Sequence, residues 1–218
     1  MCGRLSYSIP APDLLATYPW LRDAPDGPAR YNIAPTDPVL TVGPRKAEEV
    51  RWGIEGNRGV LFNLRSETAL SRPHYHGLLL RHRVLVPMSH FYEWRKVGGL
   101  ALPMAVSRKG GGILNLAALL GSWEDRVSVT ILTTPPNTDI EPLHNRMPLV
   151  LEDDDAATWV LEELALEQVA RLMKPCPEGW LRLAPASPLV NDVRNDGPQL
   201  LDPAALPPHL QLELIPPL

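Results

Sequence analysis

This sequence has few of the features that mark a secreted, membrane-spanning or metal-binding protein. Only two of its 218 residues are cysteines, Cys2 and Cys176, which excludes a disulfide framework. It has no Cys-x-x-Cys pair and no cluster of histidine and cysteine with the spacing of a zinc site. No apolar run approaches the ~20 residues that cross a bilayer, and the first residues lack the apolar core of a signal peptide. We therefore expect a cytoplasmic protein that contacts no membrane and needs no metal or cofactor.

Proline and an uneven distribution of charge are what the sequence has in excess. It contains 25 prolines, which predicts a fold rich in rigid loops. The net charge of −4 conceals a contrast, because residues 1–109 carry 15 Lys and Arg against 9 Asp and Glu, whereas residues 110–218 carry 6 against 16. Such an asymmetry is typical of a nucleic-acid-binding face in the first half, although a bias toward arginine alone would produce the same pattern.

Short strand-like segments dominate the first 133 residues. Their close spacing predicts a mainly antiparallel sheet assembly. The strands that we expect are residues 1–9, 39–42, 49–52, 60–64, 83–86, 91–94, 102–106, 113–119 and 127–133.

Helical patterns are fewer and are clearest after the last predicted strand. Residues 153–164 have acidic side chains at their start, which the helix dipole favours, and Leu and Val at helical spacing. The other helical segments that we expect are 166–174, 74–80, one that begins at Ser66, and a short one that Asp13 caps and that ends before Pro19. The tail from Pro198 is expected to be irregular.

Together these features predict an α+β fold, a mainly antiparallel β-sheet assembly with flanking helices. We expect one domain over residues 1–218, with helices and an irregular tail over residues 151–218.

Cys2 has an unusual chemistry if the initiator Met1 is removed. The freed α-amine, with a pKa near ~7.7–8.0, is far more often the neutral nucleophile at pH 7 than a lysine amine near ~10.4. It can form an iminium with an aldehyde, and the neighbouring thiol can then close a five-membered thiazolidine ring in an intramolecular step. The ring-opened sugar of an abasic site is one of the few macromolecular aldehydes. Taken alone, however, a cysteine at position 2 is better explained by chance.

Five segments together resemble the SRAP family (SOS response-associated peptidase, the abasic-site-sensing domain). Their order and spacing are similar to those of the family, and they extend over residues 2–150, about two thirds of the chain. The segments are residues 1–4 (MCGR), 31–36 (YNIAPT), 63–68 (NLRSET), 83–94 (RVLVPMSHFYEW) and 143–148 (LHNRMP).

The resemblance implies a covalent sensor of abasic sites in single-stranded DNA, with a positively charged groove for the strand. The mature N-terminal cysteine of the family forms a thiazolidine DNA–protein crosslink that shields the lesion. The word peptidase fits self-removal of the residue before Cys2. The partner is then single-stranded DNA that contains abasic sites, with nucleoid association when bound, and no obligatory protein partner is evident.

Four residues match catalytic positions of the family. Cys2 is the nucleophile. Glu93 lies among apolar residues, where burial raises the pKa of a carboxyl and suits it to carry a proton, although an ion pair with an arginine is the alternative. His144, with an ordinary pKa near ~6.5, can open the sugar ring or protonate the thiazolidine, unless it is only a surface histidine. Asn63 matches the family asparagine that positions the sugar or the α-amine, and its alternative is a turn residue.

Seven further residues are expected at the DNA. Arginine forks bind phosphate oxygens, although arginines on a surface are more often only solvated. A tryptophan that stacks on a base contributes ~1–3 kcal/mol, although tryptophan is more often a core residue. The predicted DNA-binding residues are Arg4, Arg65 and Arg146 at the backbone, Trp52 at a base, and Asn32, Pro35 and Thr134 along the groove.

The chain departs from the family pattern after Trp52 and Gly53. Only residues 54–62 precede the next motif, where the family has a longer stretch that wedges against bases, so the strand preference stays open. Two other functions stay open as well: a glutaminase-type amidohydrolase with an N-terminal nucleophile, and a non-catalytic binder of single-stranded DNA. The sequence does not decide whether the crosslink is reversible.

Overall fold

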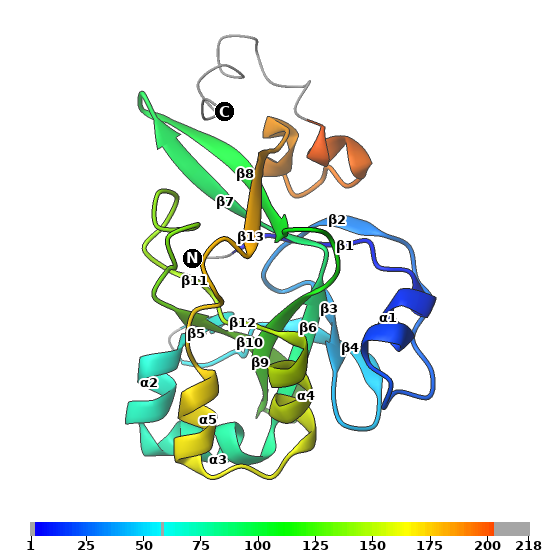
Figure 1. Cartoon of the computed structure of the whole chain (residues 1–218), viewed down its shortest axis with the longest axis vertical. Coiled ribbons are helices and arrows are strands. Elements are labelled where there is room, and N and C mark those ends of the chain that lie inside the picture. Colours follow the sequence, from blue (N-terminus) through cyan, green and yellow to red (C-terminus); the bar gives the residue numbers. More distant parts are fainter. Residues whose placement is uncertain (1–2, 58, 203–218) are drawn as a thin grey trace.

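The chain folds into two β-sheets with helices on the outer side of the larger one. A computed structural model describes residues 3–57 and 59–202. Figure 1 shows α2, α3, α4 and α5 gathered at one end of the molecule, whereas the hairpin of β7 and β8 extends from the other end. Within the described residues no helix is long and apolar enough to cross a membrane.

The described elements alternate short strands with short helices. The strands are β1 (Leu5–Tyr7), β2 (Arg30–Ile33), β3 (Pro38–Val42), β4 (Ala47–Trp52), β5 (Asn63–Arg65), β6 (Arg83–Met88), β7 (His90–Val97), β8 (Leu100–Arg108), β9 (Leu114–Trp123), β10 (Arg126–Thr134), β11 (Met147–Pro148), β12 (Val150–Leu151) and β13 (Leu181–Pro185). The helices are α1 (Ala11–Thr17), α2 (Ser66–Ser71), α3 (Pro73–Arg81), α4 (Asp153–Leu161) and α5 (Leu166–Leu172), with 3₁₀ helices η1 (Pro188–Asn191) and η2 (Pro198–Leu201).

The larger sheet closes on itself. β10 pairs with β4, β4 with β3, β3 with β6, β6 with β9, and β9 pairs again with β10. This closure removes the free edges that an open sheet would expose. β5 follows β4 along the same edge of β10, and both pair with it in parallel, so β5 is held beside the C-terminal half of β10.

The smaller sheet has the order β13-β8-β7-β1-β2 and is antiparallel throughout. One of its faces packs on the barrel through Leu5, Phe91 and Val106, which share a core with Trp52 and Ile131 of the barrel. Its other face is covered at β7 by the C-terminal segment, where Tyr92 packs among buried residues that include Val190 and Leu200. Residues 91–93 of β7 are therefore buried from both sides.

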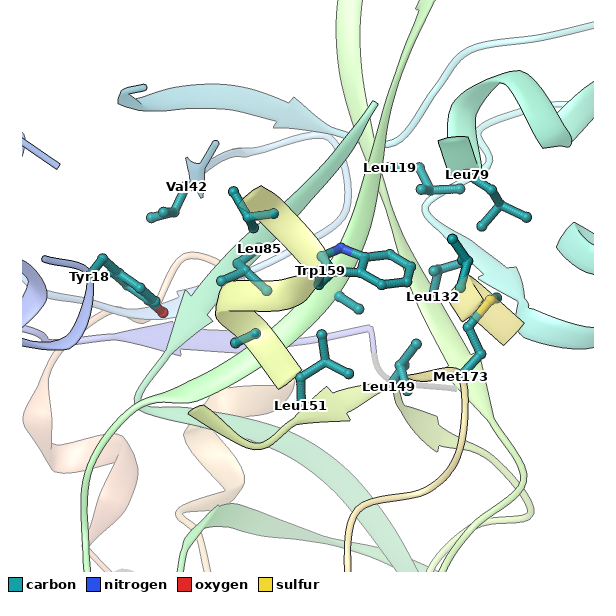
Figure 2. Close-up of a cluster of buried hydrophobic side chains, with 14 of the residues drawn as sticks. Tyr18, Val42, Leu79, Leu85, Leu119, Leu132, Leu149, Leu151, Trp159 and Met173 are labelled. Carbon is teal, nitrogen blue, oxygen red and sulfur yellow. The ribbon is translucent and has the colours of Figure 1, made fainter. Parts of the chain in front are cut away.

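A second core lies between the barrel and the helices. Trp159 of α4 has no exposed surface, and its indole nitrogen donates a hydrogen bond to the carbonyl of Val84 at 3.1 Å. Figure 2 shows its ring among the side chains of Leu85, Leu132 and Leu149 from the barrel side. This packing fixes α4 and α3 on the barrel face that lies away from the smaller sheet.

Arg83, at the start of β6, joins the C-terminal ends of α3 and α4. Its guanidinium donates to the carbonyls of Leu79 (2.6 Å), Leu80 (3.0 Å), Trp159 (2.7 Å) and Glu162 (2.5 Å). A cation is favoured at the carbonyl end of a helix, and here one side chain satisfies the last carbonyls of two helices.

The structure confirms the α+β fold class and most predicted strands. The predictions for residues 39–42, 49–52, 83–86, 91–94, 102–106 and 127–133 coincide with or lie inside β3, β4, β6, β7, β8 and β10. β1 lies inside the predicted segment 1–9, and β5 and β9 overlap the predictions 60–64 and 113–119. The helix predicted over 153–164 ends earlier, at Leu161, and the one over 166–174 ends at Leu172.

Several predictions about local structure are wrong. Asp13 does not cap α1, because the helix begins at Ala11 after Pro10 and places Asp13 in its first turn. The tail is not irregular from Pro198, since residues 198–201 form η2, and residues 203–218 lie outside the described part. Four strands, β2, β11, β12 and β13, were not predicted from the sequence.

We predict that Arg83→Met lowers the free energy of unfolding by about 2–4 kcal/mol, because buried carbonyls lose a charged donor. Urea denaturation followed by circular dichroism measures this loss. Arg81→Met is the matched control, since Arg81 is exposed at the end of the same helix, and its effect should stay within about 0.5 kcal/mol. Equal stability of the two variants would contradict the role of Arg83.

Candidate functional site

The register of β1 against β7 brings the start of the chain to Glu93. Leu5 lies opposite Phe91 and Ser6 opposite His90, and the Tyr92 amide donates to the Arg4 carbonyl at 3.0 Å. Continued two residues beyond the pair of Leu5 and Phe91, this antiparallel register sets Gly3 beside Glu93. Met1 and Cys2 lie outside the described residues, so the predicted nucleophile directly precedes Gly3, the first described residue.

Glu93 is a carboxyl removed from water. Only 3% of its surface is exposed, and it shares the core-facing side of β7 with Phe91. Burial raises the pKa of Glu93 above its ordinary value, and the positive charge that His144 can carry opposes this effect. The predicted burial of Glu93 is therefore confirmed, and so is the predicted direction of its pKa shift.

His144 lies in the loop between β10 and β11, close enough to Glu93 to act on its pKa. Leu143 holds this loop by packing against Leu102 and Met104, and Met104 is the partner of Glu93 in the β7–β8 pair. The imidazole Nδ1 lies 3.0 Å from the backbone nitrogen of Arg146 and 3.2 Å from its carbonyl oxygen. The structure thus brings two of the predicted catalytic residues together.

Asn63 and Arg65 lie at the two ends of the short strand β5. Asn63 is 8% exposed and faces Ile131 of β10, whereas Arg65 is exposed and faces Thr133. Among the described residues, Arg65 forms no hydrogen bond and no ion pair that would withdraw its guanidinium from solvent. It is the predicted arginine best placed to meet a phosphate.

Arg146 has a different environment from the one predicted. Only 7% of its surface is exposed, and its fork holds the carboxylate of Glu67, with Nη1 at 2.5 Å from Oε1 and Nη2 at 2.8 Å from Oε2. The hydrogen bond from Arg146 lowers the pKa of Glu67 to about 2. In this conformation Arg146 faces Glu67 rather than the solvent that DNA would occupy.

Arg4 and Asn32 form a polar cluster with the C-terminal segment. Arg4 donates to the Asn32 side-chain oxygen at 2.7 Å and to the Val190 carbonyl at 2.6 Å. The Asn32 amide in turn donates to the carbonyls of Asp192 (2.9 Å) and Asn195 (2.7 Å). Asn32 is 4% exposed, so it binds backbone rather than lining an open groove. We call residues 188–196 the C-terminal clamp.

Three other residues predicted at the DNA are wholly or partly covered. Trp52 has no exposed surface, donates to the Phe62 carbonyl at 2.8 Å and lies edge-on to the Phe62 ring, so no base can stack on it in this conformation. Thr134 is fully buried opposite Met147. Pro35 is half-buried in the turn after β2. Trp52, the last residue of β4, is thus a core residue, as its apolar bulk favours.

The short segment after Trp52 folds back at once. Gly53 has a positive φ of 119°, and a Cβ there would lie 2.3 Å from a methyl group of Val60. Ile54 then pairs with Leu61 in an isolated bridge. A glycine is required at this close approach, and the effect of the short segment on strand preference stays a prediction.

Sequence reasoning missed two parts of the site. Glu67 received no role, although it stands two residues after Arg65 in the same motif and is the only carboxylate there. The C-terminal clamp carried no signal, because it contributes mainly backbone carbonyls. Within residues 3–57 and 59–202 there is also no group of three or more His, Cys, Asp or Glu side chains that could hold a metal ion.

Comparisons with known proteins agree on one family. Residues 1–193 match the family model described as SOS response associated peptidase (SRAP). The chain is 26% identical to the abasic site processing protein YoqW of Bacillus subtilis, over 93% of this chain and 99% of that protein. It is 28% identical to the abasic site processing protein YedK of Escherichia coli, over 93% and 100%. A solved structure from Bacteroides thetaiotaomicron has the same fold, with a TM-score of 0.78 at 19% identity over 92% of this chain and 99% of that one.

We predict that Asn32→Ala loosens the C-terminal clamp without disturbing the barrel, because the carbonyls of Asp192 and Asn195 lose the Asn32 donor and the Val190 carbonyl keeps only Arg4. Hydrogen exchange of the amides in residues 188–196 should become at least several times faster, while exchange in β9 and β10 stays unchanged. Asn137→Ala is a useful comparison, since that buried amide binds Cys176 and Pro177 instead. Unchanged exchange in the clamp of Asn32→Ala would remove this role.

Proposed function

Since this chain belongs to the SOS response associated peptidase family, we propose that it senses abasic sites in single-stranded DNA and attaches to them covalently. The observation that carries the proposal is the β1–β7 register, which sets Gly3, the residue after Cys2, beside a buried carboxyl with a raised pKa. The relatives YoqW and YedK are named abasic site processing proteins, and the chain aligns with almost their whole length.

The reaction begins with removal of Met1, which the chain itself catalyses. The freed amine of Cys2 adds to the aldehyde carbon of the ring-opened sugar, and the carbinolamine loses water to give an iminium. The Cys2 thiol then adds to the same carbon and passes its proton to solvent or to a nearby base, which closes the thiazolidine. Ring closure removes the iminium, so the electron sink for strand cleavage by β-elimination is lost. The crosslink therefore protects the strand.

Glu93 is the residue that we assign to proton transfer during iminium formation. The carbinolamine hydroxyl needs a proton before it leaves as water, and a raised pKa makes a carboxyl a better source of that proton than an ordinary one. The same carboxylate can afterwards accept a proton. Its burial between the barrel and the C-terminal clamp supports this role, because a solvated carboxyl would stay ionised.

His144 is assigned to proton transfer at the sugar oxygen and at the thiazolidine nitrogen. A neutral imidazole has one ring nitrogen that can accept a proton and one that can donate a proton. Its proximity to Glu93 supports a shared reaction centre. Asn63, buried at the start of β5, is proposed to position the sugar or the α-amine.

We propose that the DNA backbone meets the protein at Arg65. The first half of the chain carries the excess of basic residues, and Arg65 is exposed beside β10. Trp52, Thr134 and Asn32 are left out of the proposed contact surface, because their side chains are buried. Arg4 and Arg146 reach DNA only if they leave their present partners.

The two other candidate functions have less support. A glutaminase-type amidohydrolase would share an N-terminal cysteine, but the family match covers 193 of the 218 residues and favours DNA chemistry. A non-catalytic binder of single strands would not need a buried carboxyl beside the start of the chain.

The test is an intact-mass measurement of the protein before and after incubation with a single strand that contains one abasic site. We expect loss of Met1 in the free protein and a heat-stable adduct with the DNA. Cys2→Ala should abolish the adduct. Cys176→Ala is the matched control, because that thiol is buried with its pKa raised to about 12, and it should crosslink like the unchanged protein.

Three results would overturn the proposal: retention of Met1 in protein from its native host, no adduct, or an adduct that survives Cys2→Ala. Release of ammonia from glutamine would instead support the amidohydrolase. Salt-dependent binding that ignores the abasic site would support the non-catalytic binder.

We predict that His144→Ala still forms the crosslink but releases it roughly 100-fold more slowly, because a positioned acid or base contributes about 10²–10⁴-fold. Release is measured by chasing a purified adduct with competing abasic DNA. His74→Ala, which removes an exposed histidine, should release at the normal rate. Equal release rates of the two variants would show that His144 does not act on the thiazolidine.

A further inference from the structure

Two sequence motifs meet at one ion pair. Glu67 lies in the first turn of α2, directly after β5, and Arg146 ends the loop that carries His144. In the Arg146 fork, Nη1 donates to Oε1 of Glu67 and Nη2 donates to Oε2. Bidentate pairs of this kind fix orientation as well as distance.

The Arg146 side chain is also tied to the barrel. Its Nη2 donates to the Thr133 carbonyl at 2.6 Å and lies 3.3 Å from the Thr133 hydroxyl. A buried guanidinium that lost its carboxylate would retain an uncompensated charge. Glu67 therefore determines whether Arg146 stays in this place.

The backbone of Arg146 faces the imidazole of His144 with both a donor and an acceptor. When Nδ1 carries no proton, it can accept from the Arg146 amide at 3.0 Å. When Nδ1 is protonated, it can donate to the Arg146 carbonyl at 3.2 Å. The imidazole thus has a partner in either charge state and need not move during a proton transfer. Both neutral tautomers have a partner here, and the shorter contact, with the Arg146 amide, favours the one with its proton on Nε2.

We propose that Glu67 is a positioning residue, which acts through Arg146 to hold the His144 imidazole in one orientation and one neutral tautomer. This inference rests on the proposed function, because the orientation of the His144 imidazole matters for proton transfer at the sugar. Glu67 itself need not touch the DNA. The Glu93 carboxyl interacts electrostatically with His144, and it is unchanged in the variants below.

The direct test is nitrogen-15 NMR of protein labelled at histidine, with the His144 signal assigned from its loss in His144→Gln. We expect one neutral tautomer in the unchanged protein, with the proton on Nε2. Glu67→Ala should give a mixture of tautomers, and Glu67→Gln, which keeps one acceptor for the guanidinium, should lie between. Glu48→Ala is the matched control, because that carboxylate also pairs with a cation, Lys46, but on the exposed β3–β4 hairpin.

Release of the crosslink gives a second, functional result. Glu67→Ala should slow release by up to about 100-fold, because a misplacement of 1 Å can cost that much. Glu48→Ala should not change the rate. If Glu67→Ala does not fold, Glu67→Gln carries the test alone.

The outcomes separate this inference from the proposed function. A His144 tautomer that is the same in Glu67→Ala, Glu67→Gln and the unchanged protein would overturn the positioning role, whatever the protein does to DNA. A chain that forms no adduct would overturn the proposed function, and the tautomer measurement would still decide whether Glu67 holds His144.

Discussion

The antiparallel register between β1 and β7 is the constraint on which the candidate site depends. Each residue of a strand advances the chain by ~3.3 Å and turns the side chain to the opposite face, so a slip of one residue would move Gly3 away from Glu93. Leu5 prevents such a slip, because it has no exposed surface and packs with Phe91 and Val106 in the core between the two sheets. The apolar core thereby keeps Gly3, the first described residue, beside Glu93.

Burial of β7 on both faces has a direct chemical consequence. The barrel covers the side that carries Phe91 and Glu93, and the C-terminal clamp covers the side that carries Tyr92. A carboxyl in such a strand loses most of its hydration, which raises the pKa of Glu93 above its ordinary value. The smaller sheet thus sets the environment of the candidate site as well as supporting it.

The sequence predicted the parts of the fold that depend on local patterns. Apolar runs predicted the strands β6 and β10, and the apolar neighbours of Glu93 predicted that its carboxyl is buried. Closure of the barrel could not be predicted, because it depends on pairing between residues as distant as Arg51 and Ser128. β13 was missed for a related reason: it contains an arginine and a proline, and it exists because residues 104–108 offer a free edge.

The predictions for DNA-binding residues show where sequence reasoning reaches its limit. Arg65 and Arg146 look alike in a sequence, yet one is exposed and the other is locked to Glu67 across 79 positions. Trp52 was expected at a base, but a tryptophan at the end of a central strand is covered by the next segment, here through Phe62. Exposure is a property of the whole fold, so residue type alone could not separate these cases.

The C-terminal clamp shows how a segment can matter to a site without a motif of its own. Asn32 and Arg4 bind its backbone carbonyls, at Val190, Asp192 and Asn195, and a carbonyl is supplied by any residue. The hydrogen bonds therefore require that the backbone of the clamp follows this path, and they do not require particular side chains in the clamp. The family match ends at residue 193, inside the clamp, and Asn195 beyond that point still accepts a hydrogen bond from Asn32. The motif residues hold the clamp, and the clamp covers the strand that presents Glu93.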